Sequence, residues 1–136
     1  MDKKTNSTLM RYAEEELQSI NCPLYKDIDS RIIHESYNGQ CSSFGVSVLT
    51  IGLKATLSVY YQDQPKEINN ITSQRKEAYR YCLLMVIHGM LRRQDDLETF
   101  VRKVMSNTDN EDSTLKRDVV NCSVALKQVI RTYKLG

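Results

Sequence analysis

Residues 37–61 read YNGQCSSFGVSVLTIGLKATLSVYY, and they dominate the fold that this sequence predicts. Between Phe44 and Tyr60 the chain has no proline and a single charged residue, Lys54. Read at helical spacing, the apolar residues form a surface much wider than an ordinary amphipathic stripe. We therefore expect a central helix, or two short ones, buried on most sides.

A turn is expected just before this helix. Asn38-Gly39 is a turn dipeptide, because both residues tolerate positive φ at little cost. Ser42 or Ser43 is then the expected N-cap, since a serine hydroxyl accepts hydrogen bonds from the free amides of a first turn. This pattern predicts that the central helix begins near residue 42.

Two glycines inside the central stretch are expected to shape its packing. Gly45 and Gly52 are seven residues apart, so they lie on nearly the same side of a helix and allow another helix to come close. Glycine in a helix interior costs about 1 kcal/mol relative to alanine, which makes Gly52 a candidate for a bend.

Several other segments have helical periodicity. They run from a cap at residues 6–8 to Ile20, from about Leu24 to Ile33, from Thr72 or Ser73 to about Leu91, from a cap at Asp95 through Val104, and from about Ser113 to Lys134. The last places on one face Leu115, Val119, Cys122, Leu126, Val129 and Tyr133. The sequence therefore predicts an all-α fold, a single compact bundle of about five to six helices over residues 1–136 with essentially no sheet.

Composition excludes several classes of protein. The start of the chain lacks a secretory signal, and no run of about 20 apolar residues occurs, so we expect a cytoplasmic protein without membrane contact. The four cysteines are too widely separated for a zinc motif, and we expect them to be reduced and mostly buried. Residues 1–70 hold 7 bases and 9 acids, whereas residues 71–136 hold 12 bases and 8 acids. A basic end of this kind suits contact with an anionic partner.

Neither histidine belongs to a recognisable catalytic group. His34 is followed by Glu35, but no nucleophile or second acid accompanies the pair, so a surface pair at a helix end is expected. His88 lies in an apolar helix and is expected in the core or at its boundary. The sequence also lacks a glycine-rich phosphate loop and metal-ligand spacing. We expect no catalytic residues, no metal and no cofactor.

The residues that come nearest to a functional set are basic ones that helix capping does not require. From the residues alone, ordinary solvated charge is the favoured interpretation; the alternative is nucleic-acid binding, which would take the form of contact with the phosphate backbone without reading bases. These candidate residues are Lys54, Arg75, Lys76, Arg80, Lys127, Arg131 and Lys134.

The central stretch also resembles a known family. Tyr37-Asn38-Gly39, then Ser42-Ser43-Phe44-Gly45, then Gly52-Leu53 with Thr56-Leu57 and Tyr60 is similar to the small helical subunit of type III-B (Cmr) CRISPR effector complexes. The resemblance covers about 25 residues, and the order and lengths of the remaining predicted helices agree with it. The last helix of that family often has a Trp-Leu-Lys-Arg-like motif, of which Leu126 and Lys127 are present here.

The resemblance implies a non-catalytic structural subunit of an antiviral ribonucleoprotein. Such subunits stack in several copies along the path of the guide–target duplex, so the implied partners are other Cmr complex subunits, further copies of this chain, and the backbones of guide RNA and target RNA. The alternative is a helical adaptor that binds only protein, with the face of Gly45 and Gly52 and the acidic residues 14–16 as interfaces.

Overall fold

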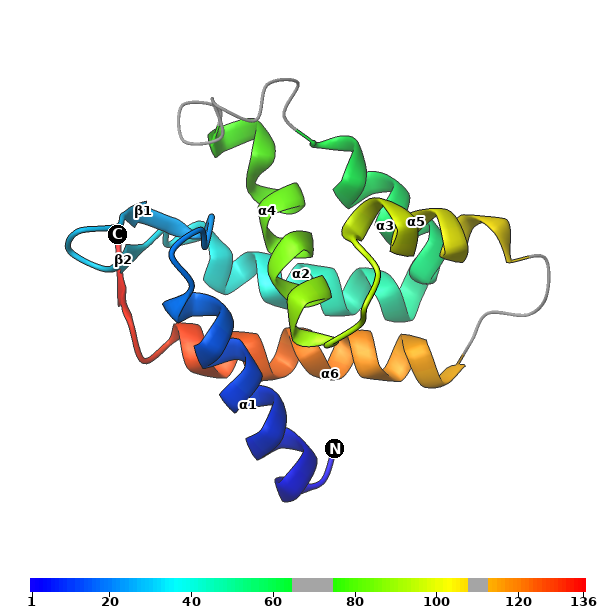
Figure 1. The fold of residues 1–136 in the computed structure, drawn as a ribbon, viewed down its shortest axis with the longest axis horizontal. Helices are drawn as coiled ribbons and strands as arrows, with labels where there is room; N and C mark the ends of the chain where they lie inside the picture. The colour runs from blue at the N-terminus through cyan, green and yellow to red at the C-terminus, as the bar shows by residue number, and fades with distance from the viewer. Residues whose placement is uncertain (65–74, 108–112) are drawn as a thin grey trace.

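The computed structural model describes residues 1–64, 75–107 and 113–136, with side chains in the second range described from residue 78 onward. These residues form six helices and three short strands (Figure 1). In chain order they are α1 (Lys3–Gln18), β1 (Tyr25–Asp27), β2 (Ile32–Ile33), α2 (Ser36–Ile51), α3 (Leu53–Gln62), α4 (Arg75–Met90), α5 (Leu97–Ser106), α6 (Ser113–Ile130) and β3 (Lys134–Leu135). The predicted all-α class with five to six helices is confirmed, with the addition of one small sheet.

Helix α1 begins earlier than the sequence pattern predicts. Its N-cap is Asp2, whose Oδ1 accepts a hydrogen bond from the backbone N–H of Thr5 at 2.7 Å. The predicted caps at residues 6–8 therefore lie inside the helix. The helix also ends before the predicted end at Ile20, which is 85% exposed. An aspartate cap is favoured because its carboxylate also stabilises the positive end of the helix dipole.

The prediction of a helix over residues 24–33 is wrong, because this segment forms a β-hairpin. Strand β1 pairs antiparallel with β2, and β2 pairs in parallel with the C-terminal strand β3. Between β1 and β2, the Asp27 Oδ1 accepts hydrogen bonds from the backbone N–H groups of Asp29 and Ser30, and Arg31 adopts a positive φ of 55°. These side-chain bonds favour a turn over a helix. The C-terminus returns beside β2, as Figure 1 shows.

The central stretch begins its helix before the predicted turn. The Nδ1 of His34 accepts the backbone N–H of Ser36 at 3.2 Å, and α2 starts there. Asn38 and Gly39 consequently lie inside α2, so the predicted turn is wrong, and the predicted cap at residues 42–43 is wrong with it. Buried apolar positions on α2 continue the helix through a dipeptide that in isolation favours a turn.

Gly52 divides the central stretch into two helices, which confirms the predicted bend. It has φ 94° and ψ 165°, a conformation that is essentially restricted to glycine. Across the corner, the hydroxyl oxygens of Ser47 on α2 and Thr56 on α3 are 2.7 Å apart, and Thr56 is completely buried. This hydrogen bond satisfies the buried threonine hydroxyl and fixes how α3 leaves α2.

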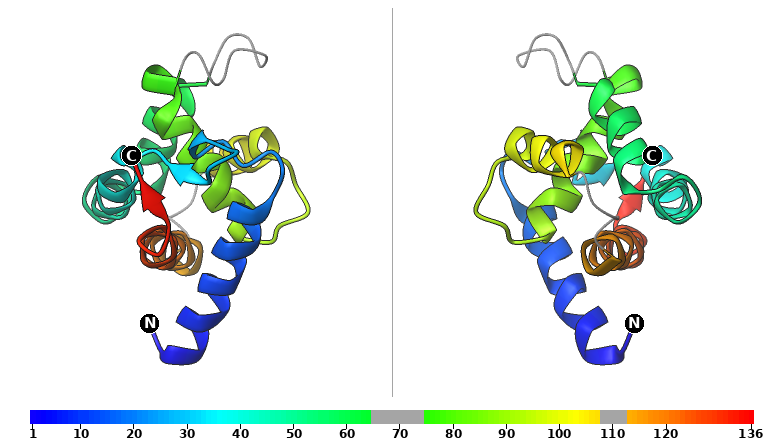
Figure 2. Two further views of the ribbon diagram at one scale, coloured as in Figure 1. Left: turned by 90° about the vertical axis from the view of Figure 1, so that its left-hand side faces the viewer. Right: turned by 90° about the vertical axis from the view of Figure 1, so that its right-hand side faces the viewer.

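Helices α2 and α6 pack along each other in opposite directions and form the centre of the bundle (Figure 1). In the views of Figure 2 these two helices are seen nearly end-on, with α1 and α4 on the same side of the pair. The largest buried side chains around them include Tyr37, Phe44, Leu57 and Leu83. The predicted seam of α6 is confirmed at four buried positions, Val119, Cys122, Leu126 and Val129.

Candidate interaction surface between α2 and α6

The side of the α2–α6 pair that faces away from α1 and α4 carries a groove between the two helices. Its base is formed where Gly45 meets Ser123. A Cβ atom on Gly45 would lie 3.0 Å from the hydroxyl oxygen of Ser123, so glycine is what allows α6 this close. The predicted close approach of a helix to Gly45 is therefore confirmed.

The walls of this groove are apolar and exposed. Val46 and Leu49 on α2 are 59% and 62% exposed, and Val124 on α6 is 43% exposed. The prediction that residues 44–60 are buried on most sides is wrong at Val46 and Leu49, because α1 and α4 cover only one side of the α2–α6 pair. Since contiguous exposed apolar groups mark interaction sites more than isolated ones do, this surface is the leading candidate for partner binding. The sequence already indicated this surface, because the apolar residues of the central stretch cover more of the helix than one buried face requires.

Two of the predicted basic residues lie at one end of this groove. The Nζ of Lys127 donates a hydrogen bond to the hydroxyl of Ser42, and Arg131 is exposed just beyond the end of α6. The residues that line the groove include no carboxylate. The surface is therefore apolar along its length and positively charged at one end.

The other predicted basic residues do not line this groove. Arg80 donates from Nε to Asp63 at 2.5 Å. Lys54 donates to the backbone carbonyl of Asn107, which follows the last residue of α5, and Lys134 is exposed on β3. The side chains of Arg75 and Lys76 lie outside the described residues. Of the seven candidates, the structure thus brings Lys127 and Arg131 together at the groove.

Basic residues after α4 pair with carboxylates from the same chain. Arg92 donates to Glu15 at 2.7 Å and to Glu16 at 2.8 Å. Its guanidinium also lies 4.7 Å from the centre of the Tyr12 ring. Gly89 leaves the space in which the Glu16 carboxylate lies. The acidic residues 15 and 16 therefore hold α1 against the end of α4.

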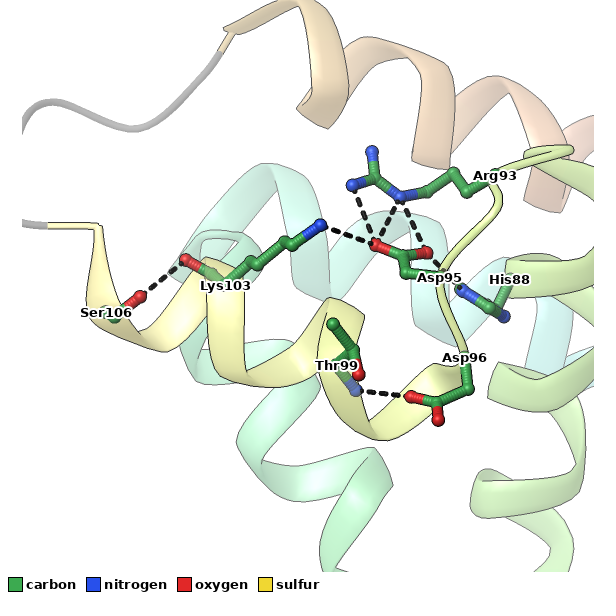
Figure 3. Close-up of polar contacts among 7 residues, drawn as sticks. All are labelled: His88, Arg93, Asp95, Asp96, Thr99, Lys103 and Ser106. Carbon is green, nitrogen blue, oxygen red and sulfur yellow. Dashed lines mark hydrogen bonds and ion pairs between the residues drawn. The ribbon is translucent and has the colours of Figure 1, made fainter.

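Asp95 is the centre of a second group of paired charges, which Figure 3 shows. Its carboxylate lies 2.9 Å from Arg93 Nη2, 3.2 Å from His88 Nε2 and 3.6 Å from Lys103 Nζ. The hydrogen bond from Arg93 is the main cause that holds the pKa of Asp95 well below its usual range. The predicted capping role of Asp95 is wrong.

The N-cap of α5 is the next residue, Asp96, which accepts the backbone N–H of Thr99 at 2.7 Å. This bond lowers the pKa of Asp96. Asp95 is thereby free to face His88, whose ring also lies 5.3 Å from that of Phe100. The prediction that His88 lies in the core or at its boundary is confirmed, and its 13% side-chain exposure places it at the boundary.

His34 is more enclosed than the predicted surface pair with Glu35. Because its Nδ1 accepts from Ser36, the neutral ring carries its proton on Nε2, which lies 2.6 Å from the Tyr79 hydroxyl. Its ring lies 4.5 Å from that of Tyr79, and the rings of Tyr79 and Tyr37 pack edge to face. His34 thus holds the start of α2 to α4.

All four cysteines are free and buried, as predicted. Burial raises the pKa of Cys41 and of Cys122 to about 12, and that of Cys22 to about 11. Thiols with such values carry almost no thiolate at neutral pH, so they serve as packing groups.

A comparison with protein-family models, curated proteins and solved structures found no match for this chain. Within the described residues, no three side chains of the metal-binding types gather into a site that could hold an ion. None of the described helices combines the length and the hydropathy needed to cross a membrane.

Proposed function

We propose that this chain is a non-catalytic helical subunit of a multisubunit assembly, held in place through the α2–α6 groove. The observation that carries the proposal is the combination on one surface of exposed apolar side chains with two cations and no lining carboxylate. When a partner removes the apolar side chains of such a groove from water, the free energy of the complex falls, which favours binding. Val46, Leu49 and Val124 would supply this contact.

The assembly that the sequence favours is the type III-B (Cmr) CRISPR effector, a cytoplasmic RNA-guided complex of antiviral defence. In this proposal, several copies of the chain stack beside other Cmr subunits along the path of guide and target RNA. Lys127 and Arg131 bind phosphate oxygens, which every nucleotide offers, so the contact is independent of sequence. The resemblance of residues 37–60 and the charge at the end of the groove both support this function.

A second candidate function is an adaptor that binds only protein. The apolar walls of the groove favour it, because an RNA backbone contact gains little from exposed valine and leucine side chains. The two candidates differ at the basic end of the groove. In the first, Lys127 and Arg131 contact RNA; in the second they lie at the rim of a protein interface.

The test is reconstitution of the effector complex with the variant Lys127→Glu/Arg131→Glu. Affinity falls as salt rises, and each contact with single-stranded RNA contributes about −0.7 to the slope of log affinity against log salt concentration. Two phosphate contacts per copy therefore contribute about −1.4. We expect the variant to assemble, to bind RNA more weakly whatever its sequence, and to have a flatter salt dependence.

The matched control reverses two exposed charges that do not line the groove, Lys3→Glu/Lys4→Glu on α1. This control changes the net charge by the same amount and should leave the RNA affinity and its salt slope near the wild-type values. If the groove variant assembles normally and both quantities match the wild type, the chain is a protein-only adaptor and the RNA contact is wrong.

A further inference from the structure

Both walls of the α2–α6 groove repeat an apolar side chain once per helical turn. On α2 the repeat is Val46 and Leu49, which are exposed, and on α6 it is Val120, which is partly buried, and Val124, which is exposed. Residues three or four apart are neighbours on a helix surface, with Cβ atoms about 5–6 Å apart. The groove therefore presents two facing rows of apolar side chains with helical spacing.

These two rows fit the apolar stripe of an α-helix better than an extended chain or an RNA strand. Apolar side chains offer no hydrogen bonds, so an extended backbone would have unpaired N–H and C=O groups against them, whereas a helix pairs these groups internally. The described residues that line the groove include no aromatic ring on which a base could stack. A helix with apolar residues at three- and four-residue spacing matches the repeat of both walls.

The charge at one end of the groove favours one direction for such a helix. Helices α2 and α6 run in opposite directions, so Lys127 and Arg131 lie where α6 ends and α2 begins (Figure 1). Lys127 donates to the hydroxyl of Ser42, which is a neutral acceptor, and Glu35, the residue before α2, does not line the groove. A helix carries partial negative charge at its C-terminal end. This end of the groove therefore suits the C-terminus of a bound helix.

We propose that the groove binds an amphipathic helix of a protein partner, with the C-terminal end of that helix at Lys127 and Arg131. The bound helix runs parallel to α6, covers Val46, Leu49 and Val124, and pairs acidic side chains of its last turn with the two cations. The proposal rests on the groove being the docking surface proposed above, and it applies to either candidate function. Lysine has three N–H donors and arginine five, so each cation can bond the helix and an RNA phosphate together.

The test titrates the whole chain with designed peptides and follows its backbone amide signals by NMR. The first peptide has about 20 residues, mainly alanine and glutamine, with leucines at i, i+3, i+4 and i+7 spacing and two glutamates in its last turn. The second has the same composition, with the leucines spread around the helix. We expect the first to shift the signals of Val46, Leu49 and Val124 saturably. It should bind at least about tenfold more tightly than the second, because only a stripe buries its leucines against both walls.

A matched pair of protein variants locates the binding site. Leu49→Ser should weaken the first peptide about tenfold, since it removes apolar contact from one wall. Ile51→Ser is the control, because Ile51 is 58% exposed on the same helix but does not line the groove. This control should leave the affinity for the peptide unchanged.

A third peptide, with its two glutamates in the first turn, tests the direction. Acidic residues there strengthen the peptide helix itself, so a lower affinity reports the lost pairing with Lys127 and Arg131. We expect binding about three- to fivefold weaker than that of the first peptide, as for two exposed ion pairs. The difference should vanish in the variant Lys127→Gln/Arg131→Gln.

Several results would overturn the proposal. They are no saturable shift at the groove, equal affinity for the first two peptides, equal losses in Leu49→Ser and Ile51→Ser, and equal affinity for the first and third peptides. Signals of the groove that shift with protein concentration and that the peptide does not displace would show that a second copy of the chain occupies it. Because the titration contains no RNA and no other subunit, its outcome is independent of the salt-dependence test of the RNA contact.

Discussion

Two basic regions of this molecule differ in what their cations face. Around α4, arginine side chains pair with carboxylates of the same chain, as Arg80 does with Asp63 and Arg93 with Asp95. At the α2–α6 groove, Lys127 donates to a neutral hydroxyl and Arg131 is exposed, and among the described residues no carboxylate pairs with either. The first region uses its charge to hold helices together, whereas the second leaves its charge available to a partner.

This difference also predicts what each region contributes. Removing a buried charge lowers folding stability, because its internal partners lose the acceptor that they share. Removing an exposed group from a surface that nothing inside the chain covers leaves stability nearly unchanged and affects only binding. Stability measurements on the isolated chain therefore test the comparison directly.

The largest effect is expected for Asp95→Asn. The carboxylate is 6% exposed and faces Arg93, His88 and Lys103, so its neutralisation leaves cationic groups without their common acceptor. We expect the free energy of unfolding to fall by about 2–4 kcal/mol, measured by urea denaturation at pH 7. The control is Asp118→Asn, whose exposed carboxylate lies 3.8 Å from Arg117 and should matter by less than about 0.5 kcal/mol. Equal effects at the two positions would show that Asp95 is not a structural centre.

The Asp95 carboxylate also makes the free energy of unfolding depend on pH. The pKa of Asp95 is lowered in the folded chain, so its contribution is complete above the unfolded value of about 3.9 and is lost as the pH falls toward the folded value. The difference in unfolding free energy between wild type and Asp95→Asn should therefore shrink steadily below about pH 4. A difference that stays constant from pH 5 to pH 2.5 would contradict this assignment.

A smaller loss is expected for Gly52→Leu, which changes the corner where α2, one wall of the groove, ends. At φ 94° and ψ 165° a side chain is strained by about 1–3 kcal/mol, despite the better helix propensity of leucine. From the sequence, Gly52 shares with Gly45 a face where another helix comes close, which predicts overpacking by leucine; the structure gives backbone conformation as the reason for the loss. Gly39→Leu is the control, because Gly39 lies within α2 and has open space around it. A stabilised Gly52→Leu would show that the corner relaxes freely.

Helices of this fold were predictable where a single face is apolar over several turns. The apolar spacing on α6 correctly predicted that Val119, Cys122 and Leu126 are buried. The two glycines correctly predicted a bend at Gly52 and the close approach of another helix at Gly45. Their signals are local, because spacing along one helix decides them. Helix existence was therefore easier to predict than helix ends, which depend on single caps such as Asp2 and Asp96.

The hairpin and the groove could not be predicted in the same way. Strand β2 pairs with a segment about 100 residues away, which no local pattern around Ile32 records. For the basic candidates, the decisive fact is whether a carboxylate lies nearby in space: Arg80 pairs with the carboxylate of Asp63, whereas Lys127 donates to the hydroxyl of Ser42. Similarly, the sequence identified Leu49 as apolar but could not show that neighbouring helices leave it uncovered.

The smallest effect on stability is expected for Leu49→Ser. Because Leu49 is 62% exposed, the substitution removes little buried area, and we expect the free energy of unfolding to change by no more than about 0.5 kcal/mol. Its matched control is Val48→Ser, one residue away on the same helix but completely buried, which should cost about 2–3 kcal/mol through a cavity and a buried hydroxyl. In reconstitution, Leu49→Ser should nevertheless weaken incorporation into the assembly, since that surface would become buried there. A Leu49→Ser chain that loses as much stability as Val48→Ser would place Leu49 in the core. One that keeps both stability and incorporation would remove the groove as the docking surface.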